Sequence, residues 1–287
     1  MRLRAATSFF IGSSIVALAV VHAAQRAPGG ASATDKPAPT PRLADGTPNL
    51  GRVPGEKGVW DVRWVPDFGD RVVGHDVPDA QRKRGYDPNH PGAASQPWVP
   101  VMPWAAAVYN YNLKNEAKYD PEGYCVPPGG PRMMVTPYPM EIVQLPEQQR
   151  ILMIFEGATH IWREIHMDGR QHPSGDALNP TYLGHSIGRW EGDTLVVDIT
   201  NLDDSTWLSD NGLIHSDKTH VIERFRREGD TLHYEVSVED PVVLAEPWKQ
   251  RPRDLKLMKD YEIEEAPFCS ERDASHLQDL SHHGNLR

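Results

Sequence analysis

The sequence predicts a mainly β protein in which an antiparallel meander closes into a lipocalin-like barrel. One observation is that Arg189 to Thr200 and Arg226 to Ser237 are near-copies of each other. Each copy reads as the end of a strand, a tight Glu-Gly turn whose glycine tolerates a positive φ, and an alternating return strand. A second observation is that short alternating segments, separated by turn residues, fill most of the chain after Cys125.

The candidate strands are residues 140–145, 150–156, 160–167, 184–190, 194–200, 219–226, 231–238 and 255–263. One N-terminal helix is expected at residues 103–118, because Pro103 suits a first helical turn and an alanine run follows it. A closed barrel leaves no exposed edge on such a meander. A two-sheet β-sandwich is the alternative, since strand counts do not separate the two architectures.

The N-terminus has the pattern of a secretory signal peptide at residues 1–23. Arg2 and Arg4 precede an apolar run that is too short to span a bilayer, and small residues follow at Ala23 and Ala24. Removing this segment takes away two arginines and moves the formal charge from −10 to −12. The mature chain is therefore expected to be periplasmic or secreted, without membrane insertion, and its acidity argues against a nucleic-acid partner.

Composition divides the rest of the chain into four parts. Residues 24–58 are rich in Ala, Pro, Gly and Thr, and they are expected to form a disordered leader because they bury too little apolar surface to offset the ordering entropy. Residues 59–124 are expected to be irregular apart from the helix. Residues 125–269 are expected to form the barrel domain, and residues 270–287 a polar tail.

The chain has two cysteines, Cys125 and Cys269. In an oxidising compartment they predict a disulfide that ties the start of the β region to its end. Two free buried thiols are the alternative. A thiolate metal site would need more ligands at suitable spacing than two distant cysteines provide.

Three motifs resemble those of a known family. They lie at Cys125 to Met134, Met167 to Pro173 and Gly184 to Leu195, and read CVPPGGPRMM, MDGRQHP and GHSIGRWEGDTL. These motifs are similar to the PPG-PR, DGR-hP and GhSiGrWEGDTLVV segments of a large group of secreted bacterial proteins from soil and marine species. The family's N-terminal DGxPDLxGvW stretch is echoed loosely by Ala44 to Leu50. The resemblance implies secretion and a common domain over residues 103–270, and it implies no particular activity.

The hairpins predict which polar side chains face the barrel interior. With Glu228-Gly229 as the turn, Glu223 lies opposite Tyr234 on an otherwise apolar face. The same register in the first hairpin places Ser186 opposite Val197. Small residues opposite large ones leave room either for a ligand or for a closely packed layer.

Two further strands contribute charged candidates. Arg163 shares a face with Ile165, so it is expected to join Glu223 inside the barrel, and Glu156 is expected to follow Leu152 inward. A buried carboxylate has its pKa raised toward neutrality, and an arginine can hold a carboxylate or a developing oxyanion. The alternative is a buried Arg163–Glu223 ion pair that only stabilises the strand register.

The outward face carries a histidine candidate. The predicted register sets His185 across from Asp198, which would orient the imidazole as a general base. Gly184 to Gly188 also matches the G-x-S-x-G pattern, but a β-turn follows instead of a helix, which argues against Ser186 as a nucleophile.

Residues in the predicted loops could surround the mouth of the barrel and bind a ligand. These are Tyr182 and His215, with Arg170 and His172 beside them. His215 and His220 are five positions apart and therefore lie on opposite faces of a strand, so no metal site is expected.

These observations favour a secreted, cofactor-independent enzyme that acts on a small, partly apolar molecule by acid–base chemistry, of the isomerase, lyase (hydratase) or cyclase type. Glu223, Arg163 and His185 are the catalytic candidates. The substrate-binding candidates are Ser186, Tyr234, Glu156, Tyr182 and His215. The alternatives are a non-catalytic barrel that binds a small ligand and an extracellular interaction module.

Overall fold

The computed structural model describes residues 38–62, 72–73, 99–115, 118–157, 161–250, 252–265 and 269. All of them belong to one compact unit, Pro37–Arg287. The predicted signal peptide, the first part of the predicted leader and the polar tail lie outside the described residues.

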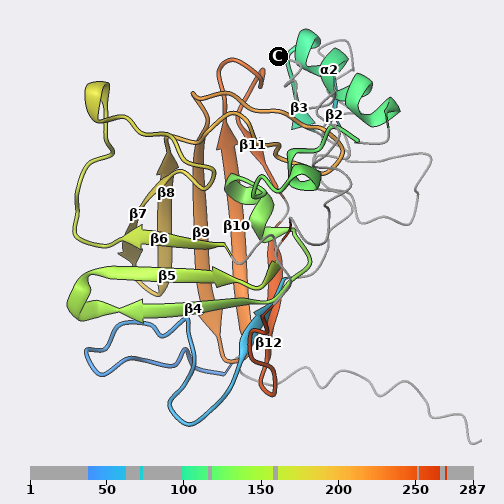
Figure 1. The fold of residues 1–287 in the computed structure, drawn as a ribbon. Coiled ribbons are helices and arrows are strands. Elements are labelled where there is room, and N and C mark those ends of the chain that lie inside the picture. Colours follow the sequence, from blue (N-terminus) through green and yellow to red (C-terminus); the bar gives the residue numbers. More distant parts are fainter. Residues whose placement is uncertain are drawn as a thin grey trace, which may run out of the picture. The chain divides into compact units, whose positions relative to one another are not determined.

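Nine strands form one closed, mixed β-barrel (Figure 1). They are β1 (Val59–Asp61), β4 (Met140–Leu145), β5 (Arg150–Phe155), β6 (Trp162–His166), β7 (His185–Glu191), β8 (Thr194–Thr200), β9 (His220–Glu228), β10 (Thr231–Glu239) and β12 (Arg253–Met258). Strands β4 to β10 pair in chain order, and β12 and β1 close the ring between β10 and β4. The lipocalin-like barrel is therefore confirmed, and the continuous ring of pairings excludes the two-sheet sandwich.

Three short strands lie outside this ring. β11 (Trp248–Lys249) pairs with the far end of β10, while β2 (Val72–Val73) and β3 (Val99–Pro100) form a separate two-stranded parallel sheet. The 3-10 turns are η1 (Pro121–Tyr124), η2 (Gly130–Met134), η3 (Pro146–Gln148) and η4 (Gly175–Ala177).

One strand pair departs from the predicted antiparallel meander. β6 and β7 run parallel and pair at only two positions, Ile165 with Ser186 and His166 with Ile187. A parallel pair needs a longer connection than a hairpin, and residues 167–184 provide it. The barrel is therefore mixed, and its wall is only briefly paired between these two strands.

Both hairpin registers differ from the predicted ones by two residues. The turns are Gly192-Asp193 and Gly229-Asp230, since Glu191 pairs with Thr194 and Glu228 with Thr231. A shift of two residues keeps each side chain on its predicted face, because the strand period is two. Glu223 accordingly faces inward, although it lies opposite Val236 and not Tyr234.

The barrel interior is an apolar core with a few polar side chains. On β9 and β10 the buried residues alternate with partly exposed ones. The fully buried core includes Met153, Ile165, Leu195, Phe225 and Leu232. This alternation reflects the period-two pattern from which the strands were predicted.

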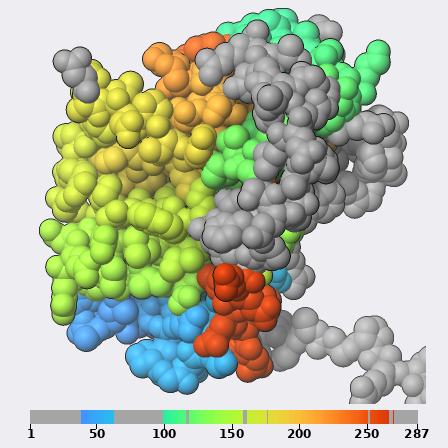
Figure 2. Space-filling model, in the orientation of Figure 1, coloured from blue at the N-terminus to red at the C-terminus, as the bar shows by residue number. Residues whose placement is uncertain are grey.

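The segment before β1 is ordered over residues 38–58, in contrast to the predicted disordered leader. Leu50 is completely buried, its backbone N–H donates to Gln144 of β4, and its carbonyl accepts from Trp60 Nε1. Arg227 donates to the carbonyls of Asn49 and Gly51. These hydrogen bonds to distant parts of the chain offset the entropy lost when the segment is ordered. The composition of the segment gives no sign of them. Figure 2 shows the segment in blue against the yellow-green surface around β4 and β5.

Two further boundaries differ from the sequence prediction. The helix, α2, spans Pro103–Lys114 and ends four residues earlier than expected. Residues 59–61, expected to be irregular, form β1 and complete the ring between β4 and β12. Trp60 of β1 is buried in the core, so the barrel includes residues well before Cys125, where the barrel domain was predicted to begin.

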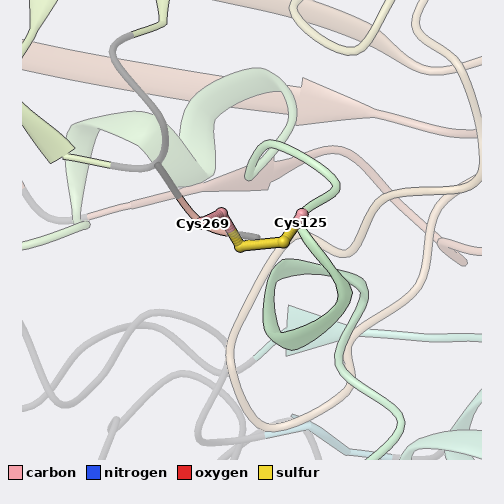
Figure 3. Close-up of a disulfide and its surroundings, with 2 residues drawn as sticks. All are labelled: Cys125 and Cys269. Atoms are coloured by element: carbon pink, nitrogen blue, oxygen red, sulfur yellow. A yellow bond between two sulfur atoms is a disulfide. The ribbon is translucent and has the colours of Figure 1, made fainter. Parts of the chain in front are cut away.

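Cys125 and Cys269 form the predicted disulfide (Figure 3), with 5.5 Å between their Cα atoms. Cys125 follows η1 directly and has a φ of 64°. The disulfide is compatible with an extracellular location, where oxidised cysteines persist. Within the described part of the chain, no helix combines the length and the apolar character that crossing a bilayer requires.

Candidate active site in the barrel wall

Arg163 of β6 and Glu223 of β9 form an ion pair inside the barrel, with 2.7 Å between Nη1 and Oε2. Their exposed fractions are 3% and 0%. Tyr234 of β10 donates its hydroxyl proton to Glu223 Oε1 over 2.7 Å. The three side chains thus lie together in the interior, on the strand faces predicted for them.

Burial, followed by the negative charge of Glu223, raises the pKa of Tyr234 well above its ordinary value. Tyr234 therefore stays protonated and acts as a hydrogen-bond donor. Glu223 Oε1 accepts the hydrogen bond from Tyr234, and Oε2 forms the ion pair with Arg163 but accepts no hydrogen bond among the described residues. Glu223 therefore serves as the counter-charge of Arg163 inside the barrel.

A second guanidinium group lies near this cluster. Arg253 of β12 sits 5.1 Å from the ring centre of Tyr234 and donates to the carbonyl of Met134 over 2.6 Å. Its pKa is lowered, mainly by burial and in spite of the nearby Tyr234 and Glu223. This part of the interior therefore holds two guanidinium groups and one carboxylate.

A cavity of about 300 Å³ opens between β6 and the chain that leads into β7. It is lined by Ile161, Trp162, Arg163, Glu164, His166, Thr181, Tyr182, Leu183, Gly184, His185 and Ser186. Gly184 has a φ of +70° and breaks the strand just before β7, so the pairing with β6 does not extend further. The cavity is lined by residues from both faces of β6, as expected for a gap in the barrel wall.

Two buried donors at this cavity lack partners. Among the described residues, neither Arg163 Nε nor Ser186 Oγ has a hydrogen-bond partner. Ser186 is 1% exposed. Buried polar groups are nearly always hydrogen-bonded, so two unpartnered donors on residues that line the same cavity indicate a place for an acceptor.

His185, on the outward face of β7, belongs to a hydrogen-bonded chain. Its Nδ1 lies 2.9 Å from Nδ1 of His172, and Nε2 of His172 lies 3.2 Å from Asp198 Oδ1. His220 Nε2 also lies within hydrogen-bond distance of Asp198, 2.9 Å from Oδ1. Because a carboxylate only accepts, His172 donates from Nε2, and in the Nε2–H tautomer its Nδ1 is the acceptor. His185 therefore donates from Nδ1 and keeps a lone pair on Nε2, which has no partner among the described residues.

The surroundings of His185 favour its neutral form. Burial, followed by the neighbouring His166 and His172, lowers its pKa to about 4. The ring of His166 lies 5.0 Å from that of His185, and its own pKa is lowered mainly by burial. At neutral pH the cavity therefore presents an uncharged imidazole that can accept a proton.

The partner predicted for His185 is corrected. In the observed register His185 lies opposite Thr200, and Asp198 lies opposite Ile187. The contact between His185 and Asp198 is instead made through His172, which the sequence placed only among loop residues near the mouth. No local pattern could have found this role, since His172 lies in the long β6–β7 connection.

Two predicted binding residues, Tyr182 and Glu156, lie in different places. Tyr182 is 39% exposed and lines the cavity. Glu156 continues the outward-facing residues of β5 and accepts hydrogen bonds from the Tyr261 hydroxyl and the Glu264 backbone N–H. Its inward placement was wrong because β5 is apolar on both faces and gives no register signal.

His215 is also corrected. It was expected at the barrel mouth but is 5% exposed. Its Nε2 lies 2.8 Å from Thr206 Oγ1, and its Nδ1 lies 3.1 Å from the Ser216 carbonyl. His215 therefore stabilises the β8–β9 connection and does not face the cavity.

Within the described ranges, no group of three or more His, Cys, Asp or Glu side chains is arranged to hold a metal ion. What the cavity offers is an imidazole acceptor, a hydroxyl donor and a guanidinium donor. These groups suit proton transfer next to a bound oxygen atom.

Fold and site together define a class: a disulfide-linked mixed β-barrel protein with a cavity in its wall. No family model, no curated protein and no solved structure matches the chain. The function therefore has to be derived from the site itself.

Proposed function

We propose that this protein is a secreted, cofactor-independent enzyme that uses acid–base chemistry on a small, partly apolar molecule, as an isomerase, lyase (hydratase) or cyclase does. The observation that carries the proposal is the His185–His172–Asp198 chain at the cavity, which leaves a lone pair on His185 Nε2. A general base needs such an unprotonated nitrogen within reach of the substrate.

In this proposal His185 takes a proton from a carbon or oxygen atom of the bound molecule and later returns it. The imidazolium formed keeps its Nδ1–H bond to His172, and Asp198 stabilises the charge through that ring. The N–H of Arg163 and the hydroxyl of Ser186 stabilise the negative charge that develops on a substrate oxygen. That negative charge also raises the basicity of His185, which offsets its low pKa in the free protein.

Glu223 and Tyr234 have a positioning role in this proposal. The sequence suggested Glu223 as the acid–base group, but it is fully buried behind Arg163 and does not line the cavity. Its ion pair with Arg163 and the hydrogen bond it accepts from Tyr234 keep the guanidinium of Arg163 in place.

The second candidate function is non-catalytic binding of the same kind of molecule. The two unpartnered donors favour it as much as they favour catalysis, because they require only an acceptor. Proton transfer separates the two functions.

The test measures solvent deuterium incorporation. The mature protein, residues 24–287, is incubated in D₂O with ketones, carboxylic acids and cyclic alkenes, and each compound is analysed by mass spectrometry. Catalysis predicts protein-dependent exchange in one chemical class, with a loss of about 100-fold or more in His185→Gln.

The matched control is His233→Gln. His233 lies on β10, contacts Asp254 and Glu228, and is not part of the cavity, so exchange should continue. Exchange that survives His185→Gln would assign the chemistry to another group. Saturable binding without exchange would establish the binding function, and the absence of both would remove the cavity as the site.

A further inference from the structure

We infer that the part of this cavity lined by Arg163 and Ser186 is a subsite for a single carboxylate group of the ligand. This inference rests on the proposed function, because it concerns the same cavity, and it specifies the class of substrate. It is carried by the unpartnered donors of Arg163 and Ser186 and by the charge balance behind them.

The partners of Arg163 leave one of its nitrogens unused. Nη1 contacts Glu223, Nη2 lies 2.8 Å from the sulfur of Met153, and Nε is buried without a partner among the described residues. Ser186 Oγ is in the same state, and both residues line the cavity. A carboxylate accepts on both of its oxygens and can satisfy a guanidinium N–H and a hydroxyl together.

The charges around the cluster call for one more anion. Arg163 and Arg253 are positive, Glu223 is the only carboxylate in the described part of the cluster, and Tyr234 stays neutral. A buried positive charge without a counter-charge is unfavourable. A ligand with one negative charge restores neutrality, whereas a phosphate dianion would exceed it and would need more donors than the two available.

The apolar and aromatic lining residues determine the rest of the ligand. These are Ile161, Trp162, Tyr182 and Leu183, so the body of the ligand is apolar. The volume of about 300 Å³ lies at the lower end of the usual range for ligand cavities. The fitting class is a small monocarboxylate with an aromatic or short aliphatic body.

Isothermal titration calorimetry of the mature protein tests this. The probes are phenylacetate, benzoate and hexanoate, each compared with its neutral amide of the same shape. At least one acid should bind saturably, with its amide about tenfold weaker or more, because hydrogen bonds to a charged group are the stronger ones.

Ser186→Ala supplies the decisive variant. It removes an unpartnered hydroxyl and should leave the fold intact, while the acid binds about tenfold more weakly. Thr200→Val is the matched control, because Thr200 Oγ1 is also buried without a partner among the described residues but does not line the cavity. Affinity for the acid should not change in this control.

Several outcomes would overturn the subsite: equal affinity for acid and amide, unchanged affinity in Ser186→Ala, or no saturable binding of any of the three acids. In the last case an ordered water satisfies the donors. The two proposals fail separately. Carboxylate binding without deuterium exchange contradicts catalysis alone, and exchange of neutral ketones without a preference for acids contradicts the subsite alone.

Discussion

Arg163 and Glu223 are almost completely buried, and each is the counter-charge of the other inside the barrel. Glu223→Ala leaves a buried guanidinium unpaired, and we expect the free energy of unfolding to fall by about 3–5 kcal/mol. Equilibrium unfolding in urea, followed by tryptophan fluorescence, measures the change.

The double variant Arg163→Met, Glu223→Leu is the control for this prediction. It removes both charges and fills the space with apolar atoms, so it should lose much less stability than Glu223→Ala. If the double variant is the less stable of the two, the pair contributes net stability of its own.

His185 makes the stability of the protein depend on pH. Its pKa is about 4 in the folded protein, against 6.5 for an unperturbed histidine. As the pH falls below 6.5, the unfolded chain takes up this proton and the folded chain does not, so stability declines down to about pH 4. Above pH 6.5 His185 is neutral in both the folded and the unfolded state, so it does not make stability depend on pH in that range.

The measurement is the urea midpoint between pH 7 and pH 4 for the parent protein and for His185→Gln. The variant should lose less stability across this interval, because one source of differential proton uptake is gone. Equal slopes in the parent and in His185→Gln would mean that His185 is protonated in the folded state as readily as in the unfolded one.

Among the structural elements, the junction before β7 determines where the barrel wall opens. Gly184 has a φ of +70°, and a Cβ added there would lie 2.6 Å from the Thr200 carbonyl oxygen. Gly184→Ala therefore combines backbone strain with a steric clash, and we expect a loss of at least about 2 kcal/mol in unfolding free energy. Binding of any cavity ligand should weaken as well, because Gly184 lines the cavity.

Gly192→Ala is the matched control, since Gly192 also has a positive φ, of +60°, but nothing lies within 4 Å of an added Cβ. It should cost only the backbone strain, about 1 kcal/mol. Thermal unfolding compares the two variants. Equal losses would show that the close contact with Thr200 relaxes without cost.

At the scale of the whole molecule, the disulfide links positions 144 residues apart. Replacing both cysteines with serine should lower the free energy of unfolding by about 2–5 kcal/mol, because the unfolded chain gains the freedom that the link removes. The barrel should still form, since neither cysteine belongs to a barrel strand. A reductant should lower the melting temperature of the parent and leave that of the double variant unchanged. No effect of the reductant on the parent would show that the link does not restrict the unfolded chain.

The sequence by itself determined the strand pattern, the helix start at Pro103 and the inward faces of β9 and β10. These features follow from a local period of two and from turn residues, which act over a few positions. It also determined that Arg163 and Glu223 face the interior, because each lies on the apolar side of its own strand. The predicted registers of the two hairpins were wrong by two residues, but a shift of two keeps each side chain on the same face, so these assignments still hold.

Only the tertiary structure decided the rest. The parallel β6–β7 pair, the closure through β1 and β12 and the ordering of residues 38–58 arise from contacts between distant parts of the chain. The same holds for the cavity and for the His185–His172–Asp198 chain, because a loop histidine has no periodic pattern to indicate its partner. The physical reason is that local propensity acts on neighbours in sequence, whereas a site forms where separate strands and loops meet in space.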